Sequence, residues 1–134
     1  MNKHKILVID DEQGIRDMVS YTLLKEGYAV FTAANGAEGV EQVIKNDIDV
    51  AITDIKMPGM DGIEVLKKIK EVKPEVEVIV ATGYGSTETA VESLRKGAYD
   101  YINKPFNIDE LSSLVSKAIE KKQIKSKLVS MEEL

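Results

Sequence analysis

The 134-residue chain contains no cysteine, a single histidine and only three prolines. Without cysteine, there can be no disulfide framework, no thiolate nucleophile and no zinc–thiolate site. No apolar run approaches the roughly 20 residues that a membrane-spanning helix needs, and no secretory signal pattern is present. We therefore expect a cytoplasmic protein that does not enter a membrane.

The chain also lacks an excess of basic residues. It carries 18 Lys and Arg against 23 Asp and Glu, a net charge of -5, which argues against direct nucleic-acid binding by this segment. The lone histidine, His4, lies near the N-terminus and is expected to be solvated rather than to carry phosphate. There is no P-loop pattern, and Gly83-x-Gly85 lacks the third glycine of a dinucleotide-binding loop.

Short apolar runs are present instead, and they alternate with helical patterns. Hydrophobic residues make up 43% and charged residues 31% of the chain, which is typical of one globular domain with a substantial core. The apolar runs predict five strands, at residues 5–10, 29–34, 50–53, 76–82 and 99–103. Helical patterns follow them around residues 15–26, over 36–46, around 63–73, over 87–96 and from 107 onward.

Local signals mark several of these helix ends. Gly27 and Gly97 are expected to end the first and fourth helices, and Ser86 to cap the fourth. Asn107 and Glu110 have capping-box spacing for the last helix. Five strands that alternate with five helices indicate an α/β fold, in which a parallel sheet is covered by helices on both faces.

Polar side chains follow the predicted strands where each strand ends. The first strand runs into Asp10 and Asp11, the third into Asp54, the fourth into Thr82 and the fifth into Lys104. In open α/β sheets, ligands bind outside the carboxyl ends of the strands. We therefore expect these five side chains to form one site.

Three carboxylates brought together repel one another, and a divalent cation relieves the repulsion. An all-oxygen donor set suits Mg²⁺. The neighbouring lysine and threonine supply a cation and a hydroxyl donor of the kind that a phosphoryl group needs. An aspartate can itself be the nucleophile and form an aspartyl phosphate.

Each of these residues also has a purely structural interpretation. Asp10 and Asp11 are the kind of residue that favours a helix start, Thr82 is a β-branched strand end, and Lys104 is a solvated cation. Their joint placement favours the site. Glu12 is interpreted as a helix-stabilising residue, and Asp61 as a turn or helix cap without a chemical role.

Four blocks in order, "VIDDE", "TDIKMPGMDG", "VATGYG" and "DYINKPF", resemble the receiver domain of bacterial two-component response regulators over nearly all of residues 3–121. The resemblance implies a doubly wound, flavodoxin-like five-stranded parallel sheet with strand order 2-1-3-4-5. It implies that Asp54 accepts phosphate from a histidine kinase. It also implies that Mg²⁺ is the cofactor, and the implied ligands are Asp10, Asp11, Asp54 and the backbone carbonyl of Lys56.

The same resemblance assigns the remaining polar residues. Thr82 and Lys104 would bind the phosphoryl oxygens, Thr82 and Tyr101 would form the switch, and the bond before Pro105 would be cis. The segment "GYGSTETAVESLRKGAYDYINKPF" looks most like receivers of enhancer-binding transcription activators.

A stand-alone, sporulation-type phosphorelay receiver that passes phosphate to a histidine phosphotransferase is the second interpretation. The third is a phosphohydrolase with an aspartate nucleophile, of the haloacid-dehalogenase kind. That third interpretation is disfavoured because the D-x-D pattern and room for a capping insertion are missing. Only the phosphohydrolase is an enzyme in the ordinary sense; a receiver catalyses only its own phosphotransfer and autodephosphorylation.

Beyond the predicted receiver domain, residues 1–121, the chain ends in a charged segment, residues 122–134. We interpret this segment as a helical extension or a linker toward an output domain in cis, outside the given sequence. Ile124, Leu128 and Met131 have heptad-like spacing in it, which is compatible with a homodimer.

Overall fold

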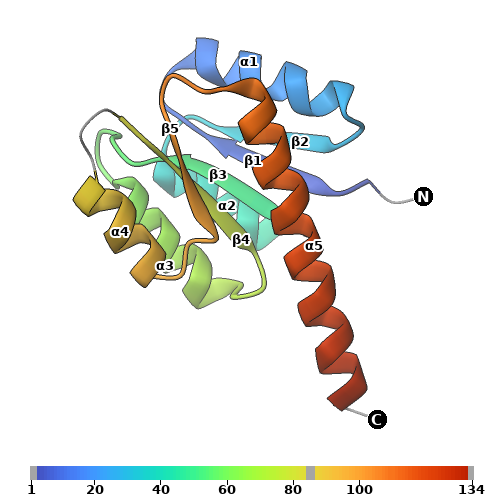
Figure 1. Ribbon diagram of the computed structural model, residues 1–134. Coiled ribbons are helices and arrows are strands. Elements are labelled where there is room, and N and C mark those ends of the chain that lie inside the picture. The colour runs from blue at the N-terminus through green and yellow to red at the C-terminus, as the bar shows by residue number, and fades with distance from the viewer. Residues whose placement is uncertain (1–2, 84–86, 133–134) are drawn as a thin grey trace.

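The computed structural model describes residues 3–83 and 87–132, and this part of the chain forms five strands and five helices that alternate (Figure 1). The fourth-helix cap expected at Ser86 and the second glycine of Gly83-x-Gly85 lie outside the described residues. The elements are β1 Lys5–Ile9, α1 Gln13–Lys25, β2 Ala29–Ala33, α2 Gly36–Lys45, β3 Val50–Asp54, α3 Gly62–Val72, β4 Glu77–Thr82, α4 Thr87–Arg95, β5 Asp100–Asn103 and α5 Ile108–Glu132.

The strands form one parallel sheet in the order β2-β1-β3-β4-β5. This arrangement confirms the doubly wound fold and the strand order. The inner strands are almost wholly buried, because helices cover both of their faces. α2 and α3 pack on one face and α1 and α5 on the other, which gives the molecule three layers (Figure 1).

Several helix ends follow the local signals in the sequence. Asn35, Asp61 and Asn107 each accept a hydrogen bond from the backbone amide three residues later, as N-caps do. Gly27 and Gly97 have positive φ angles of 92° and 104° just past α1 and α4, a conformation that glycine adopts at little cost. The expected cap at Asn107 and the expected stops at both glycines are confirmed.

The cap at Asp61 supports a prediction that separates fold from chemistry. Its side chain accepts from the amide of Glu64 at 3.0 Å, at the start of α3. We expect Asp61→Ala to lower the free energy of unfolding by about 1 kcal/mol and to leave phosphate labelling intact. Denaturant unfolding and labelling of the same preparation measure both; a variant that folds normally but no longer takes label would contradict the assignment of Asp61 as a cap.

The last helix is longer than the predicted domain. α5 continues unbroken across residue 121 to Glu132 (Figure 1), so the terminal segment is helical as far as it is described. Ile124 and Leu128 on it are exposed, whereas the side chain of Met131 lies outside the described part. None of the helices in residues 3–83 and 87–132 combines the length and apolarity needed to cross a membrane.

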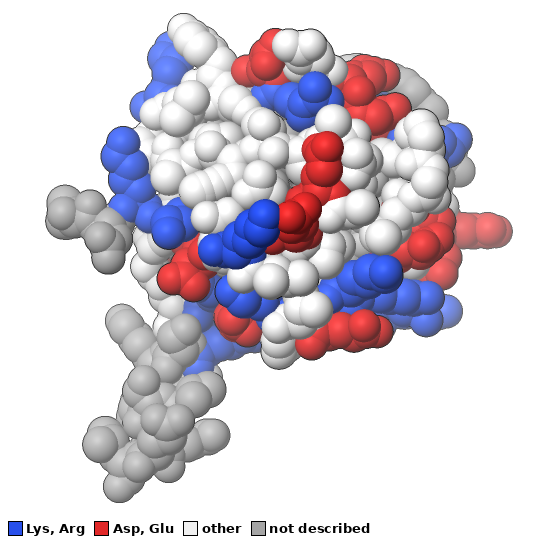
Figure 2. All heavy atoms as spheres, turned by 180° about the vertical axis from the view of Figure 1, so that it is seen from behind, with Lys and Arg blue, Asp and Glu red and all other residues white. Residues whose placement is uncertain are grey.

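Charged side chains of both signs are distributed over the surface seen from behind (Figure 2). Near the centre of that view, acidic side chains lie directly beside basic ones and are surrounded by uncharged residues. The surplus of acidic residues is therefore not gathered into one area of this face.

Candidate functional site

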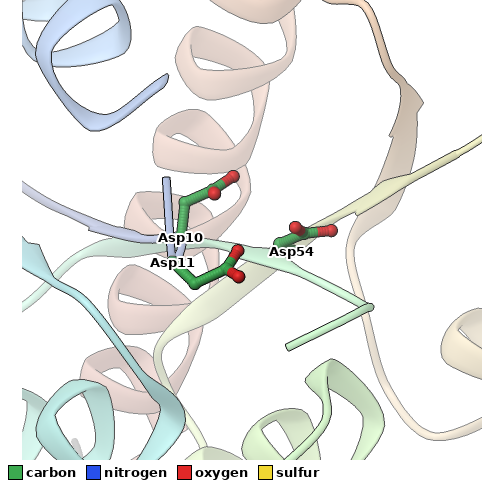
Figure 3. Close-up of side chains that lie close together, drawn as sticks. All are labelled: Asp10, Asp11 and Asp54. Atoms are coloured by element: carbon green, nitrogen blue, oxygen red, sulfur yellow. The ribbon is translucent and has the colours of Figure 1, made fainter. Parts of the chain in front are cut away.

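Three aspartates meet at the carboxyl edge of the sheet (Figure 3). Asp10 and Asp11 follow β1, Asp54 ends β3, and one oxygen of each lies within 4.8 Å of the others. Asp10 is only 2% exposed, Asp54 is half-buried and Asp11 is exposed. The cluster is therefore buried at Asp10 and open to solvent at Asp11.

The register of the sheet brings these residues together. β1 and β3 are parallel neighbours in which Ile9 lies opposite Thr53, so the next residues, Asp10 and Asp54, leave the sheet side by side. The amide of Asp10 still donates to the carbonyl of Ala33 in β2, at 3.1 Å. The backbone of Asp10 is thus held as a continuation of β1 while its side chain is released toward the cluster.

Lys104, which follows β5, joins the aspartates. Its Nζ donates to Asp10 Oδ2 at 2.7 Å and to Asp54 Oδ2 at 2.9 Å. Burial alone would lower the pKa of Lys104, but the hydrogen bonds to these carboxylates and their charges outweigh it and raise that pKa. The ion pairs therefore stabilise the fold below the ordinary lysine pKa, and that contribution is lost only as the pH rises through the raised pKa.

Asp10 is fixed through several atoms. The amide of Glu12 donates to its Oδ1 at 2.9 Å, and Lys104 to its Oδ2. Nη1 of Arg16, one turn into α1, donates to its carbonyl oxygen at 2.7 Å. This carboxylate is thus held in one orientation before any ligand is bound.

Backbone atoms of neighbouring residues lie close to Asp54. The amide of Lys56 donates to its Oδ1 at 3.3 Å, so the loop after β3 curls around the carboxylate. A Cβ added to Gly62, at the start of α3, would lie 2.4 Å from the carbonyl oxygen of Asp54. Only glycine allows α3 to begin this close to the end of β3.

Thr82 and Tyr101 lie on the two strands beyond β3. Thr82 ends β4, is 2% exposed, and donates its hydroxyl to Oδ1 of Asn103 at 3.2 Å. Tyr101, on β5 opposite Val80, is 37% exposed. The peptide bond between Lys104 and Pro105 is cis.

The structure therefore brings four expected residues into direct contact or close range: Asp10, Asp11, Asp54 and Lys104. Thr82 lies one strand away from Asp54, which faces Ala81 in the register. Tyr101 lies at the edge of the sheet, outside the cluster. His4 is half-buried at the opposite end of the sheet, with Nδ1 3.7 Å from Asp49 Oδ2.

Some described residues that contact the expected site residues were not themselves expected there. Among them are Glu12 and Arg16, which bind Asp10, Gly62, which lies against the backbone of Asp54, and Asn103, which binds Thr82. Gly62 lies within the block "TDIKMPGMDG" and Asn103 within "DYINKPF", so both belong to recognised motifs although no role was assigned to them. For Arg16, no sequence signal indicated a role at the cluster, because its contact is to backbone.

The donor set suits a hard cation such as Mg²⁺, because carboxylate oxygens from three residues converge and one of these residues, Asp11, is exposed to solvent. Lys104 neutralises part of the charge on Asp10 and Asp54. Among the described residues, Asp11 has no ion pair of this kind. Asp11 is therefore the carboxylate with the most to gain from a bound cation.

This difference leads to a prediction about Mg²⁺ and stability. At tenfold above its Kd, Mg²⁺ is expected to raise the melting temperature by about 4–6 °C, since it binds only the folded protein. Asp11→Ala should remove most of that rise, and should slightly stabilise the metal-free protein because one repelling charge is gone. Calorimetry with and without Mg²⁺ measures both effects; an Asp11→Ala protein with the full Mg²⁺ response would contradict the role of Asp11.

Comparison with known proteins identifies a family that matches most of the chain. Residues 6–116 match the response regulator receiver domain. The chain is 43% identical to sporulation initiation phosphotransferase F of Bacillus subtilis (strain 168) over 117 residues, which are 87% of this chain and 94% of that protein. It is 40% identical to the DNA-binding transcriptional regulator NtrC of Escherichia coli (strain K12) over 119 residues, 89% of this chain but 25% of that protein.

A solved structure of a receiver domain is also similar to this chain. The crystal structure of a response regulator receiver domain protein from Clostridium thermocellum superposes with a TM-score of 0.87, at 38% identity, and covers 90% of this chain and 98% of that one. The chain thus spans nearly the full length of some relatives and about a quarter of others.

Proposed function

The chain belongs to the response regulator receiver domains, the signalling switches of two-component systems, and we propose that Asp54 is its phosphoacceptor. The observation that carries this proposal is the contact between Asp54 and Lys104, beside Asp10 and Asp11, at the carboxyl edge of the sheet. Asp54 is the member of the cluster that combines a fixed backbone with partial exposure.

The chemistry follows from these positions. An oxygen of Asp54 attacks the phosphorus of a phosphohistidine on a sensor kinase, the P–N bond breaks, and the imidazole leaves with its electron pair. Mg²⁺, held by Asp10, Asp11, Asp54 and the backbone carbonyl of Lys56, would offset the charge of the incoming group. Lys104 moves from pairing with carboxylates to pairing with a phosphoryl oxygen, and Thr82 donates its hydroxyl to another.

The proposed switch residues, Thr82 and Tyr101, lie on β4 and β5. A new charged group on Asp54 draws Thr82 toward it, and Tyr101, on the neighbouring strand, moves into the space behind β4. The change would reach the surface of α4 and α5 and alter self-association of the chain as a homodimer. Autodephosphorylation, by attack of water on the same aspartyl phosphate, ends the signal.

The output is proposed to be transcription activation, through a domain that follows α5 in cis. Support comes from the likeness to NtrC, of which the chain covers a quarter, and from the continuation of α5 past residue 121 as the lead into such a domain. A stand-alone phosphorelay receiver in the cytoplasm, passing phosphate to a histidine phosphotransferase, is the second candidate. It is favoured by 43% identity over nearly the whole of a relative of similar length.

Turnover distinguishes a switch from a phosphohydrolase. Incubated with acetyl phosphate and Mg²⁺, the protein is expected to take up at most one phosphate per chain and to leave p-nitrophenyl phosphate and sugar phosphates unhydrolysed. The measurement is radiolabel stoichiometry beside free-phosphate release. Sustained release from several unrelated phosphomonoesters would refute the switch.

A further inference from the structure

The hydroxyl of Thr82 already has a partner before any phosphoryl group is present. Oγ1 of Thr82 donates to Oδ1 of Asn103 at 3.2 Å. The two residues lie directly opposite each other in the parallel register of β4 and β5. This bond is therefore built into the pairing of the two strands.

The same strand end also carries the lysine of the site. The amide of Lys104 donates to the carbonyl of Thr82 at 2.8 Å, and the Lys104 ammonium reaches Asp10 and Asp54. Asn103 is exposed, and the bond from Thr82 is the one hydrogen bond of its side chain within residues 3–83 and 87–132. Its amide is thus placed for Thr82 and for no other described group.

A hydroxyl has one proton to donate. When Thr82 donates to Asn103, it cannot donate to an oxygen on Asp54, so the two acceptors compete. We propose that Asn103 is a positioning residue that holds the Thr82 hydroxyl in the resting arrangement and so opposes the phosphorylated one. This inference rests on the proposed function, in which Thr82 donates to the phosphoryl group.

The outcome of this competition depends on the relative strengths of the two hydrogen bonds. A neutral hydrogen bond shifts an equilibrium by roughly 2- to 10-fold net, whereas a bond to an ionised oxygen is roughly twice as strong in free-energy terms. Once Asp54 is phosphorylated, the Thr82 hydroxyl therefore donates to the phosphoryl group. The bond to Asn103 determines how much free energy favours the resting arrangement over the phosphorylated one. Removing the Asn103 amide should favour the phosphorylated arrangement without touching the acceptor.

Beryllofluoride, which mimics a phosphoryl group on a carboxylate, tests this with Mg²⁺ held constant. Asn103→Ala is expected to bind beryllofluoride roughly 2- to 10-fold more tightly than the wild type. In a Thr82→Ala background, the same Asn103→Ala change is expected to alter the affinity less than 2-fold, since no hydroxyl remains to be held. Equal affinities of wild type and Asn103→Ala, or an equal gain in both backgrounds, would overturn the proposal.

A second measurement needs neither Mg²⁺ nor beryllofluoride. Three-bond NMR couplings report the χ1 rotamers of Thr82, and we expect one rotamer in the wild type and a mixture in Asn103→Ala. An unchanged single rotamer would overturn the inference and leave the proposed function standing. A wild type that binds no beryllofluoride would refute the proposed function, and with it the role of Asn103 against phosphorylation, whatever the rotamers show.

Discussion

Asp54→Asn is expected to abolish phosphate labelling by acetyl phosphate and Mg²⁺, from up to one phosphate per chain to none. An amide oxygen is a poor nucleophile and cannot form the acyl phosphate. The fold should survive, because Lys104 keeps its bond to Asp10 at 2.7 Å and the asparagine side chain has nearly the same shape. Intact-mass analysis of freshly labelled protein, beside an unfolding curve, measures both.

A carboxylate on another part of the surface supplies the control. Asp47 is exposed and lies with His4 and Lys122 around a pocket on a different part of the molecule from the aspartate cluster. Asp47→Asn removes the same charge and should label at the wild-type rate. If Asp54→Asn took up phosphate on Asp11 or elsewhere at a comparable rate, or if the wild type labelled equally well without Mg²⁺, the assignment of the site would be wrong.

The central part of this site was predictable because it depends on strand ends. Asp10 and Asp54 each follow a continuous apolar run, and in a parallel sheet such residues must leave at one edge. Their approach therefore follows from strand identity and order alone. The same reasoning placed Thr82 and Lys104 at the carboxyl ends of the next two strands.

The remaining contacts depend on quantities that no sequence pattern expresses. The bond between Thr82 and Asn103 requires the register of β4 against β5, which a shift of one residue would abolish. The role of Gly62 requires the distance between α3 and the end of β3. Arg16 binds a carbonyl oxygen, which every residue has, so its partner could not be identified from residue types.

The terminal helix shows the same limit. Its charged composition indicated a helical extension or a linker. The segment is helical as far as it is described, and three lysines of α5 lie against carboxylates at the amino edge of the sheet. Lys122 donates to Asp49 at 2.6 Å, and Lys125 donates to Glu77 at 3.0 Å, with Lys121 at 3.8 Å from the same side chain. A boundary at residue 121 therefore falls within a set of ion pairs rather than between two independent parts.

The ion pairs of Lys121 and Lys125 are important for stability because both involve the carboxylate of Glu77. Glu77 begins β4, is fully buried, and its Oε2 has no hydrogen-bond partner among the described atoms. Lys70 of α3 is nearby, but its Nζ donates to the carbonyls of Pro74 and Val76. Burial lowers the pKa of Lys70, and the charge of Glu77 partly restores it. The cations within ion-pair distance of Glu77 thus come from α5.

Replacing both of these cations, Lys121→Met together with Lys125→Met, is therefore expected to lower the free energy of unfolding by about 2–3 kcal/mol. A buried carboxylate left without its partner costs about 3–5 kcal/mol when the pair is fully enclosed, and these lysines are about half exposed. Methionine keeps the apolar stem of each side chain, but it loses the cation–π contact of the Lys121 ammonium, which lies 5.4 Å from the centroid of the Tyr99 ring. Urea unfolding at neutral pH measures the loss.

Two further variants identify the cause. Lys117→Met removes an exposed lysine of the same helix that has no ion pair among the described residues, and should change stability by less than about 0.5 kcal/mol. Glu77→Gln, added to the double lysine variant, should recover most of the loss, because a neutral amide no longer needs a cation. If the double variant unfolds at the same urea concentration as Lys117→Met, or if Glu77→Gln restores none of the lost stability, the buried carboxylate does not depend on the α5 lysines. If both results hold, the segment after residue 121 is part of the folded domain, and whatever follows it is attached to a helix that the sheet itself holds in place.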